Sequence, residues 1–274
     1  MKILLQSGLA CLAMAVASAQ PQWPAAVQEL FQRGVEAQKA GRLDDAERAF
    51  QDVLEQGGKA SFVHNNLGIV YQSRGDHESA LAQFREAIRM DPTYTAPRIL
   101  AGASLVATGK FAAATTELEK AVKLAPGEPQ GRLQLAWVLE RQGRLEQAAE
   151  QYRELRKLVP NEPEYAYRLG KMYLKLAAKY FRKMSEIAPS APRTLQLKGE
   201  NLVAIGKEDE AIESFRKALS LAPKQPGLHL VLAQIYAKQG KRAEALKEVE
   251  EELAILPDNA AALAMRTRLL NAAR

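Results

Sequence analysis

The amino-acid sequence predicts an all-α fold: an α-solenoid of about seven stacked helix–turn–helix units, closed by a C-terminal capping helix. Two regularities predict this fold, because each recurs along the chain every 34 residues with a single interruption. Glycines expected to turn the chain between helices lie at Gly41, Gly75, Gly109, Gly143, Gly206 and Gly240. Prolines expected to end the second helix of a unit lie at Pro92, Pro126, Pro160, Pro189, Pro223 and Pro257. Such a period is typical of proteins in which each unit packs only against its neighbours.

Residues 64–92 show the repeating unit most clearly. Apolar or small residues recur in each half at helical spacing, so each half has one face that packs. These residues are Leu67, Gly68, Tyr71, Ala80, Phe84 and Ala87. Small side chains at Gly68 and Ala80 allow two helices to approach closely, while Phe84 fills the space between them. A helix pair of this kind leaves apolar surface open and therefore needs a neighbour.

The same pattern recurs in phase along most of the chain. Leu-Gly-x-x-Tyr occurs at residues 67–71 and 169–173. An alanine opens the packed face of the second helix at Ala46, Ala80, Ala114, Ala148, Ala177, Ala211 and Ala245. Four residues later comes Phe50, Phe84, Leu118, Tyr152, Phe181, Phe215 or Val249. The pattern resembles the tetratricopeptide repeat over nearly all of residues 27–259, and this resemblance implies a right-handed superhelix.

The repeat spacing divides the chain into segments. The predicted repeats are 27–60, 61–94, 95–128, 129–162, 163–191, 192–225 and 226–259, preceded by an extended lead at 20–26 and followed by a capping helix at 260–274. The fifth repeat is five residues shorter than the others and lacks the turn glycine. It is expected to form either a very tight turn or one longer helix, with two sub-blocks meeting near residues 174–176.

Residues 1–19 have the pattern of a signal peptide. Lys2 gives a positive start, an apolar run follows, and Ala17-Ser18-Ala19 resembles a cleavage site. We therefore expect a mature chain that begins at Gln20 and is exported to the periplasm or the extracellular space. The apolar run is too short to span a bilayer, so no membrane span is expected in the mature protein. Peripheral association with the cell envelope stays open, and lipoprotein anchoring at Cys11 is not expected, because Gly8 fits a lipobox poorly.

Catalysis, cofactors and nucleic acid are not indicated by the sequence. No nucleotide-binding glycine motif and no nucleophile motif occurs, and no segment outside the repeats could hold a catalytic domain. His64 and His229 occupy the same repeat position, where packing is the expected role, and no metal site is predicted. The formal net charge is +6, but basic and acidic residues alternate without a block of one sign. We expect no enzyme, no cofactor and no nucleic-acid partner.

The resemblance implies that the first helices of the repeats line a concave groove. The predicted groove residues are Phe31, Phe62, Asn65, Ile69, Ile99, Val106, Leu133, Trp137, Arg141, Tyr167, Lys171 and Lys175. An exposed apolar groove marks a binding site, and Trp and Arg are favoured anchors. The alternative reading, that these side chains fill the gaps between successive first helices, stays open.

The groove predicts a scaffold that binds a peptide or protein segment, with the assembly of envelope complexes as its setting. Arg141, Lys171 and Lys175 would steer an acidic portion of the partner. The alternative is a carrier of a lipid or another apolar small molecule in the same groove.

Overall fold

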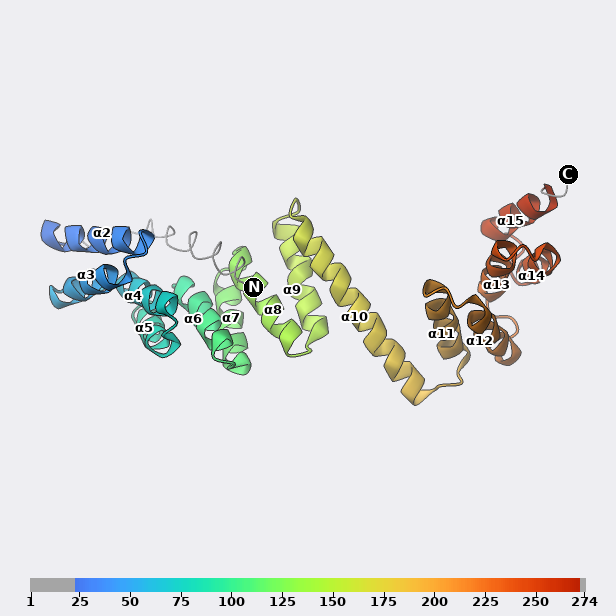
Figure 1. Cartoon of the computed structure of the whole chain (residues 1–274), viewed down its shortest axis with the longest axis horizontal. Coiled ribbons are helices and arrows are strands. Elements are labelled where there is room, and N and C mark those ends of the chain that lie inside the picture. Colours follow the sequence, from blue (N-terminus) through green and yellow to red (C-terminus); the bar gives the residue numbers. More distant parts are fainter. Residues whose placement is uncertain (1–22, 272–274) are drawn as a thin grey trace. The chain divides into compact units, whose positions relative to one another are not determined.

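The computed structural model describes residues 23–271, and this part is all-α, as the sequence predicts (Figure 1). It divides into two compact units, and we call the part up to Leu176 the N-terminal unit and the part from Ala177 the C-terminal unit. The helices are α2 (Ala25–Lys39), α3 (Leu43–Glu55), α4 (Ser61–Arg74), α5 (His77–Met90), α6 (Ala96–Ala107), α7 (Phe111–Leu124), α8 (Pro129–Arg141), α9 (Leu145–Leu158), α10 (Pro163–Ile187), α11 (Pro192–Ala204), α12 (Glu208–Leu221), α13 (Leu228–Lys238), α14 (Arg242–Ile255) and α15 (Ala260–Asn271). The predicted signal peptide, with Cys11, lies outside the described residues.

The turn inside each complete repeat depends on glycine. Gly75 follows α4 with φ of 83°, a left-handed conformation that side chains with a Cβ rarely adopt. Asp76 then caps α5, because its carboxylate accepts a hydrogen bond of 3.0 Å from the backbone N–H of Ser79. The two helices α4 and α5 consequently pack against each other as an antiparallel pair.

Close packing within a repeat pairs a first-helix glycine with a large second-helix side chain. A Cβ built at Gly68 would overlap the ring of Phe84, which is fully buried. The same relation joins Gly34 to Phe50, Gly102 to Leu118, and Gly199 to Phe215. The glycines of the first helices therefore let the two helices of a repeat approach closely. The phenylalanine or leucine side chain of the second helix fills the space beside each glycine.

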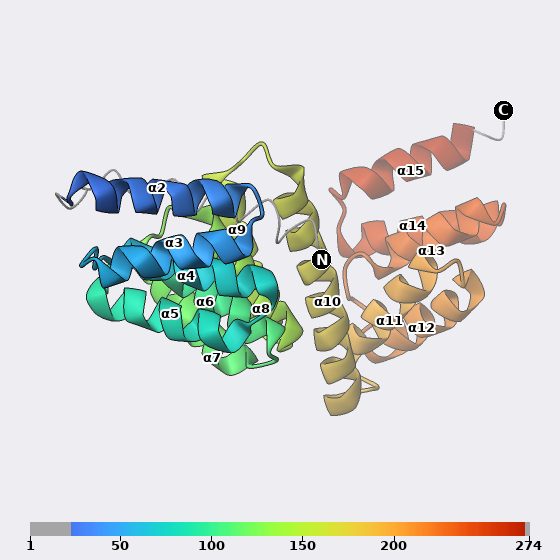
Figure 2. The ribbon, with the colours of Figure 1, turned by 60° about the vertical axis from the view of Figure 1, so that its left-hand side comes forward.

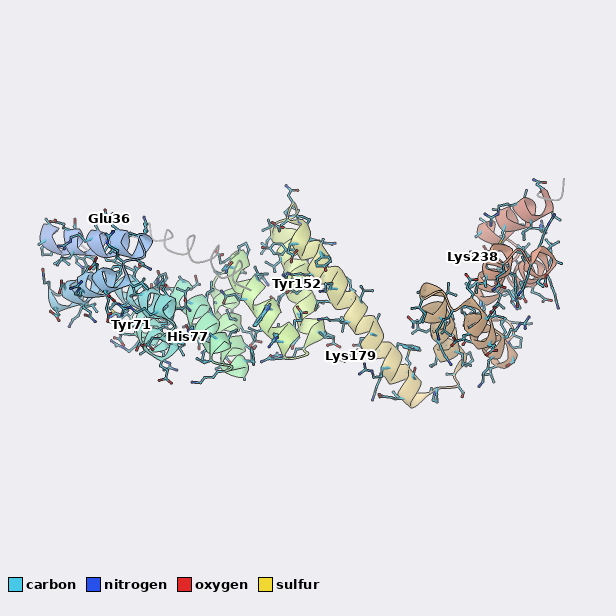
Figure 3. The ribbon with its side chains drawn as sticks, in the orientation of Figure 1. Glu36, Tyr71, His77, Tyr152, Lys179 and Lys238 are labelled. Carbon is cyan, nitrogen blue, oxygen red and sulfur yellow. The ribbon has the colours of Figure 1, made fainter. Side chains whose placement is uncertain are left out.

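Polar contacts connect one repeat to the next in the N-terminal unit. The hydroxyl of Tyr71, labelled in Figure 3, donates a 2.7 Å hydrogen bond to Glu47 of α3, and Arg74 forms ion pairs with Glu47 and Asp44. The hydrogen bond from Tyr71 lowers the pKa of Glu47, burial raises it, and Arg74 lowers it again, so the net direction is downward. Farther along, Gln72 of α4 donates 2.8 Å to the hydroxyl of Ser104 of α6.

The fifth repeat forms one continuous helix, α10, of 25 residues (Figure 1). Of the two outcomes that its short sequence allows, the structure therefore shows the longer helix and not the tight turn. No glycine follows Gly170 within this helix, and Leu174, Lys175 and Ala178 favour helical backbone where a turn would have to form. The boundary between the two units falls after Leu176, where the sequence predicts two sub-blocks to meet.

The C-terminal unit ends in α15, which packs on α14. Ala262, Met265 and Leu269 are its buried residues, whereas Leu270 is half exposed. Next to it, the buried carboxylate of Glu252 accepts hydrogen bonds of 2.9 and 3.0 Å from the N–H of Gly227 and one of 3.1 Å from Asn259. Among the helices of residues 23–271, none has the length and apolar composition needed to cross a bilayer.

Candidate functional site

The predicted groove residues lie on the first helices of successive repeats, all in the N-terminal unit. Helices α2, α4, α6 and α8 contact one another in that order, and Figure 2 shows α4, α6 and α8 next to one another. The row continues to the first half of α10, where Lys175 Nζ lies 2.5 Å from Glu140 Oε1 of α8. The unit thus brings side chains from five repeats into one row, although their exposure differs sharply.

Three of the predicted residues are buried between the helices. Asn65 is 1% exposed, Ile69 4% and Ile99 1%, so these side chains fill the gaps between helices. The side-chain oxygen of Asn65 has no hydrogen-bond partner among the described residues, so an unused acceptor lies buried beside the row. A partner on the present surface would not touch Ile69 or Ile99 directly.

An aromatic cluster occupies the start of the row. Phe31 of α2 and Phe62 of α4 are partly buried, and their ring centroids are 5.2 Å apart. Trp23 packs on both, with centroid distances of 5.8 Å to Phe31 and 5.3 Å to Phe62. Edge-to-face and tilted contacts of this kind stabilise aromatic groups beyond simple burial. Trp23 therefore holds the segment before α2 against these two rings. The contact covers part of the surface of Phe31 and Phe62 that a partner could otherwise reach.

The middle of the row presents a tryptophan and an arginine together. Val106, Leu133 and Trp137 are partly buried and pack on the main core of the unit. The exposed guanidinium carbon of Arg141 lies 5.5 Å from the ring centroid of Trp137 and 6.0 Å from that of Phe111. This stacking holds the cation in place above an aromatic surface that solvent still reaches.

The first half of α10 repeats this combination of an aromatic ring and a cation. Tyr167 is 62% exposed, and the ammonium of Lys171 lies 5.5 Å from its ring centroid. Lys175 differs, because its ammonium is already paired with Glu140. The charge of Lys175 is therefore compensated by a carboxylate. Arg141 and Lys171 instead lie against the aromatic rings of Trp137 and Tyr167.

His64 and His229 belong to a series of polar pairs that the sequence interpretation missed. Nδ1 of His64 lies 2.8 Å from Gln83, and Nδ1 of His229 lies 2.7 Å from Glu248. Two other repeats pair arginine in the same way: Arg98 to Glu117 and Arg132 to Gln151. Each pair joins repeat position four to a residue 19 places later, a spacing that could have revealed it. Within residues 23–271 no His, Cys, Asp and Glu side chains gather in a group that could hold a metal.

Fold and surface together define a class of protein. It is a helical-repeat protein whose buried packing residues recur from unit to unit and whose surface carries a row of aromatic rings paired with cations. Two family models, both described as tetratricopeptide repeat, match residues 31–95, 99–163, 133–192 and 202–269, which is most of the chain. The chain belongs to the tetratricopeptide repeat family. No curated protein matches it in sequence.

Two solved structures support the fold, and a third is reported beside them. A tetratricopeptide repeat protein from Parabacteroides merdae ATCC 43184 is 12% identical with a TM-score of 0.51, covering 90% of this chain and all of its own. MamA from Desulfovibrio magneticus RS-1, residues 41 to the end, is 18% identical with a TM-score of 0.50, covering 76% of this chain and 99% of its own. YrrB, described as a TPR protein with an unusual peptide-binding site, is 20% identical with a TM-score of 0.43. The match covers 81% of this chain and 100% of YrrB. At these identities the likeness concerns the fold alone.

Proposed function

We propose that this protein is an exported, non-catalytic scaffold that binds a segment of another protein along the first helices of its N-terminal unit. The assembly of cell-envelope complexes is the setting we propose. Membership of the tetratricopeptide repeat family supports a role in protein–protein interaction. The observation that favours this particular surface is the repeated pairing of an exposed cation with an aromatic ring, Arg141 with Trp137 and Lys171 with Tyr167.

The chemistry of this surface selects an occupant with two features. Partly buried Leu133 and Trp137 offer apolar area that a partner can cover, and Trp and Arg are the side chains most often found as binding anchors. Arg141 and Lys171 add positive charge beside that area, which attracts a carboxylate and orients the approaching chain. A polypeptide segment with apolar side chains next to acidic ones fits both. Ile69 and Ile99 support this surface from beneath.

Crosslinking from position 137 tests the surface. A photo-crosslinking phenylalanine analogue replacing Trp137 in cells is expected to give a discrete protein adduct. Adding Arg141→Glu should reduce the adduct about tenfold, which corresponds to about 1.4 kcal/mol of lost binding. The same analogue at Leu124, 44% exposed on the second helix α7, is the control and should not give this adduct. Equal adducts from both positions would contradict the proposal, as would an adduct whose added mass is that of a lipid.

Export is tested at the amino terminus. We expect the protein purified from its native cell to begin at Gln20, because cleavage follows Ala17-Ser18-Ala19. Intact-mass measurement and amino-terminal sequencing report the cleavage site directly. Replacing Ala19 by a bulky residue such as tyrosine should leave the uncleaved chain, since cleavage requires a small residue there. A mature chain that still begins at residue 1 would contradict export by this route.

A further inference from the structure

A tryptophan from the segment before α2 lies across the first two helices of the row. Trp23 packs on Phe31 of α2 and also on Phe62 of α4, the first helix of the next repeat. A residue that only capped the first repeat would cover the side of α2 that faces away from α4. Because Trp23 contacts rings from both helices, it covers the seam between them, where the predicted groove begins.

The two rings in contact with Trp23 have a firm base. We call Phe31 and Phe62 the aromatic seat. Phe31 packs on Phe50, which is fully buried, with the ring centroids 5.6 Å apart. Phe31 and Phe62 also pack against the hydrophobic core at the start of the unit, and both are only partly buried with Trp23 in place. The core therefore supports the aromatic seat independently of Trp23.

One hydrogen bond adds to the ring contacts of Trp23. Among the described residues, the carbonyl oxygen of Trp23 accepts a bond of 3.0 Å from Nε2 of Gln28, on an exposed part of α2. Pro24 follows Trp23, which favours extended backbone at Trp23 and keeps it outside the helix. Cleavage after Ala19 would make Trp23 the fourth residue of the mature chain. The ring is then held mainly by packing, close to a free amino terminus.

We propose that Trp23 is a displaceable occupant of the aromatic seat, and that an aromatic side chain of the partner segment takes its place. This inference rests on the proposed function, because the partner is the segment that binds along the first helices. A ring tethered by a short linker competes at an effective concentration in the millimolar range. The partner also meets Trp137 and Arg141 farther along the row, and these added contacts let it displace the tethered ring.

Displacement makes the surface selective. A segment with an aromatic side chain replaces Trp23 and gains ring contacts that stabilise beyond simple burial. A segment without one leaves Trp23 in place and binds through the middle of the row alone. Because the aromatic seat is free only part of the time, the apparent affinity falls by the free fraction. A seat that is free about one tenth of the time weakens binding about tenfold.

Fluorine NMR on the full chain labelled with 5-fluorotryptophan tests displacement. The chain contains two tryptophans, Trp23 and Trp137, and the Trp23→Phe variant assigns their signals. N-acetyl-tryptophanamide at about 20 mM, above the effective concentration of the tethered ring, is expected to move the Trp23 signal toward that of a solvent-exposed indole. N-acetyl-alaninamide is the control and should leave the signal unchanged. A Trp23 signal that N-acetyl-tryptophanamide does not move would overturn the proposal.

Removing the ring tests the aromatic seat itself. Trp23→Ala should bind N-acetyl-5-fluorotryptophanamide about tenfold more tightly than the wild-type protein, as measured by broadening of the probe's fluorine signal. Adding Phe31→Ala or Phe62→Ala should remove this gain, whereas adding Leu124→Ala, on an exposed part of α7, should keep it. Circular dichroism selects the variants that retain the wild-type helix content. Equal affinities of Trp23→Ala and the wild type, or a gain that survives loss of either phenylalanine, would overturn the proposal.

The crosslink from position 137 separates this inference from the proposed function. Trp23→Ala is expected to raise the yield of the protein adduct, because the aromatic seat is then free for the partner. An adduct of unchanged yield would overturn the displacement of Trp23 and leave the proposed function standing. Absence of the adduct both with and without Trp23→Ala would overturn both.

Discussion

Replacing Phe84 by alanine is expected to lower the free energy of unfolding of the N-terminal unit by about 3–5 kcal/mol. The ring is fully buried, belongs to the main core of the unit and fills the space above Gly68, so its loss leaves a cavity between α4 and α5. Denaturation followed by tryptophan fluorescence measures this, because both tryptophans, Trp23 and Trp137, lie in the N-terminal unit.

A truncation on the surface provides the control for Phe84→Ala. Leu124, at the end of α7, is 44% exposed, and its replacement by alanine should change the stability by no more than about 0.5 kcal/mol. Comparable losses for the two variants would mean that Phe84 is not packed as described.

Gly68→Ala is expected to lower the stability of the same unit by about 1–3 kcal/mol. The added methyl group overlaps the Phe84 ring, so the two helices must move apart. In the background of Phe84→Ala the same change should instead stabilise the unit by up to about 1 kcal/mol, because the clash is gone and alanine favours helix over glycine. A double-mutant cycle of the four variants measures this change of sign.

The control for Gly68→Ala is Gly131→Ala on α8. A Cβ at Gly131 meets its nearest atom, on Ile99, at an ordinary 3.5 Å, so this buried glycine should accept alanine without loss. If Gly68→Ala destabilised equally with and without Phe84, contact with the ring would not be the cause.

The sequence predicts the repeating unit well because its determinants are local. Gly75 must adopt positive φ, Gly68 must leave room for a ring, and Pro92 cannot continue a helix. Each requirement restricts the residue type at its position, so it can be recognised in the sequence. The fifth repeat leaves two outcomes open, because the absence of a turn glycine does not say whether a strained turn or a helix replaces it.

The candidate surface is harder to predict than the fold. Ile99 and Leu133 occupy the same position of neighbouring first helices, 34 residues apart, yet Ile99 is buried and Leu133 is only partly buried. Exposure there depends on how far successive repeats rotate, which changes with every side chain between them. The pair of Arg141 and Trp137 follows from helical spacing of four residues, whereas the additional contact of Arg141 with Phe111 joins two repeats and leaves no sequence signal.

The single helix of the fifth repeat also limits cooperativity. In a repeat protein each interface couples the folding of one unit to that of the next. Two distant units therefore fold together only if every interface between them is intact. At α10 the glycine-to-ring contact inside the repeat is missing, because a Cβ at Gly170 would meet no atom within 4 Å. Under the proposed function, a segment bound along the first helices would stabilise the N-terminal unit directly, because all of the proposed contact residues lie within that unit.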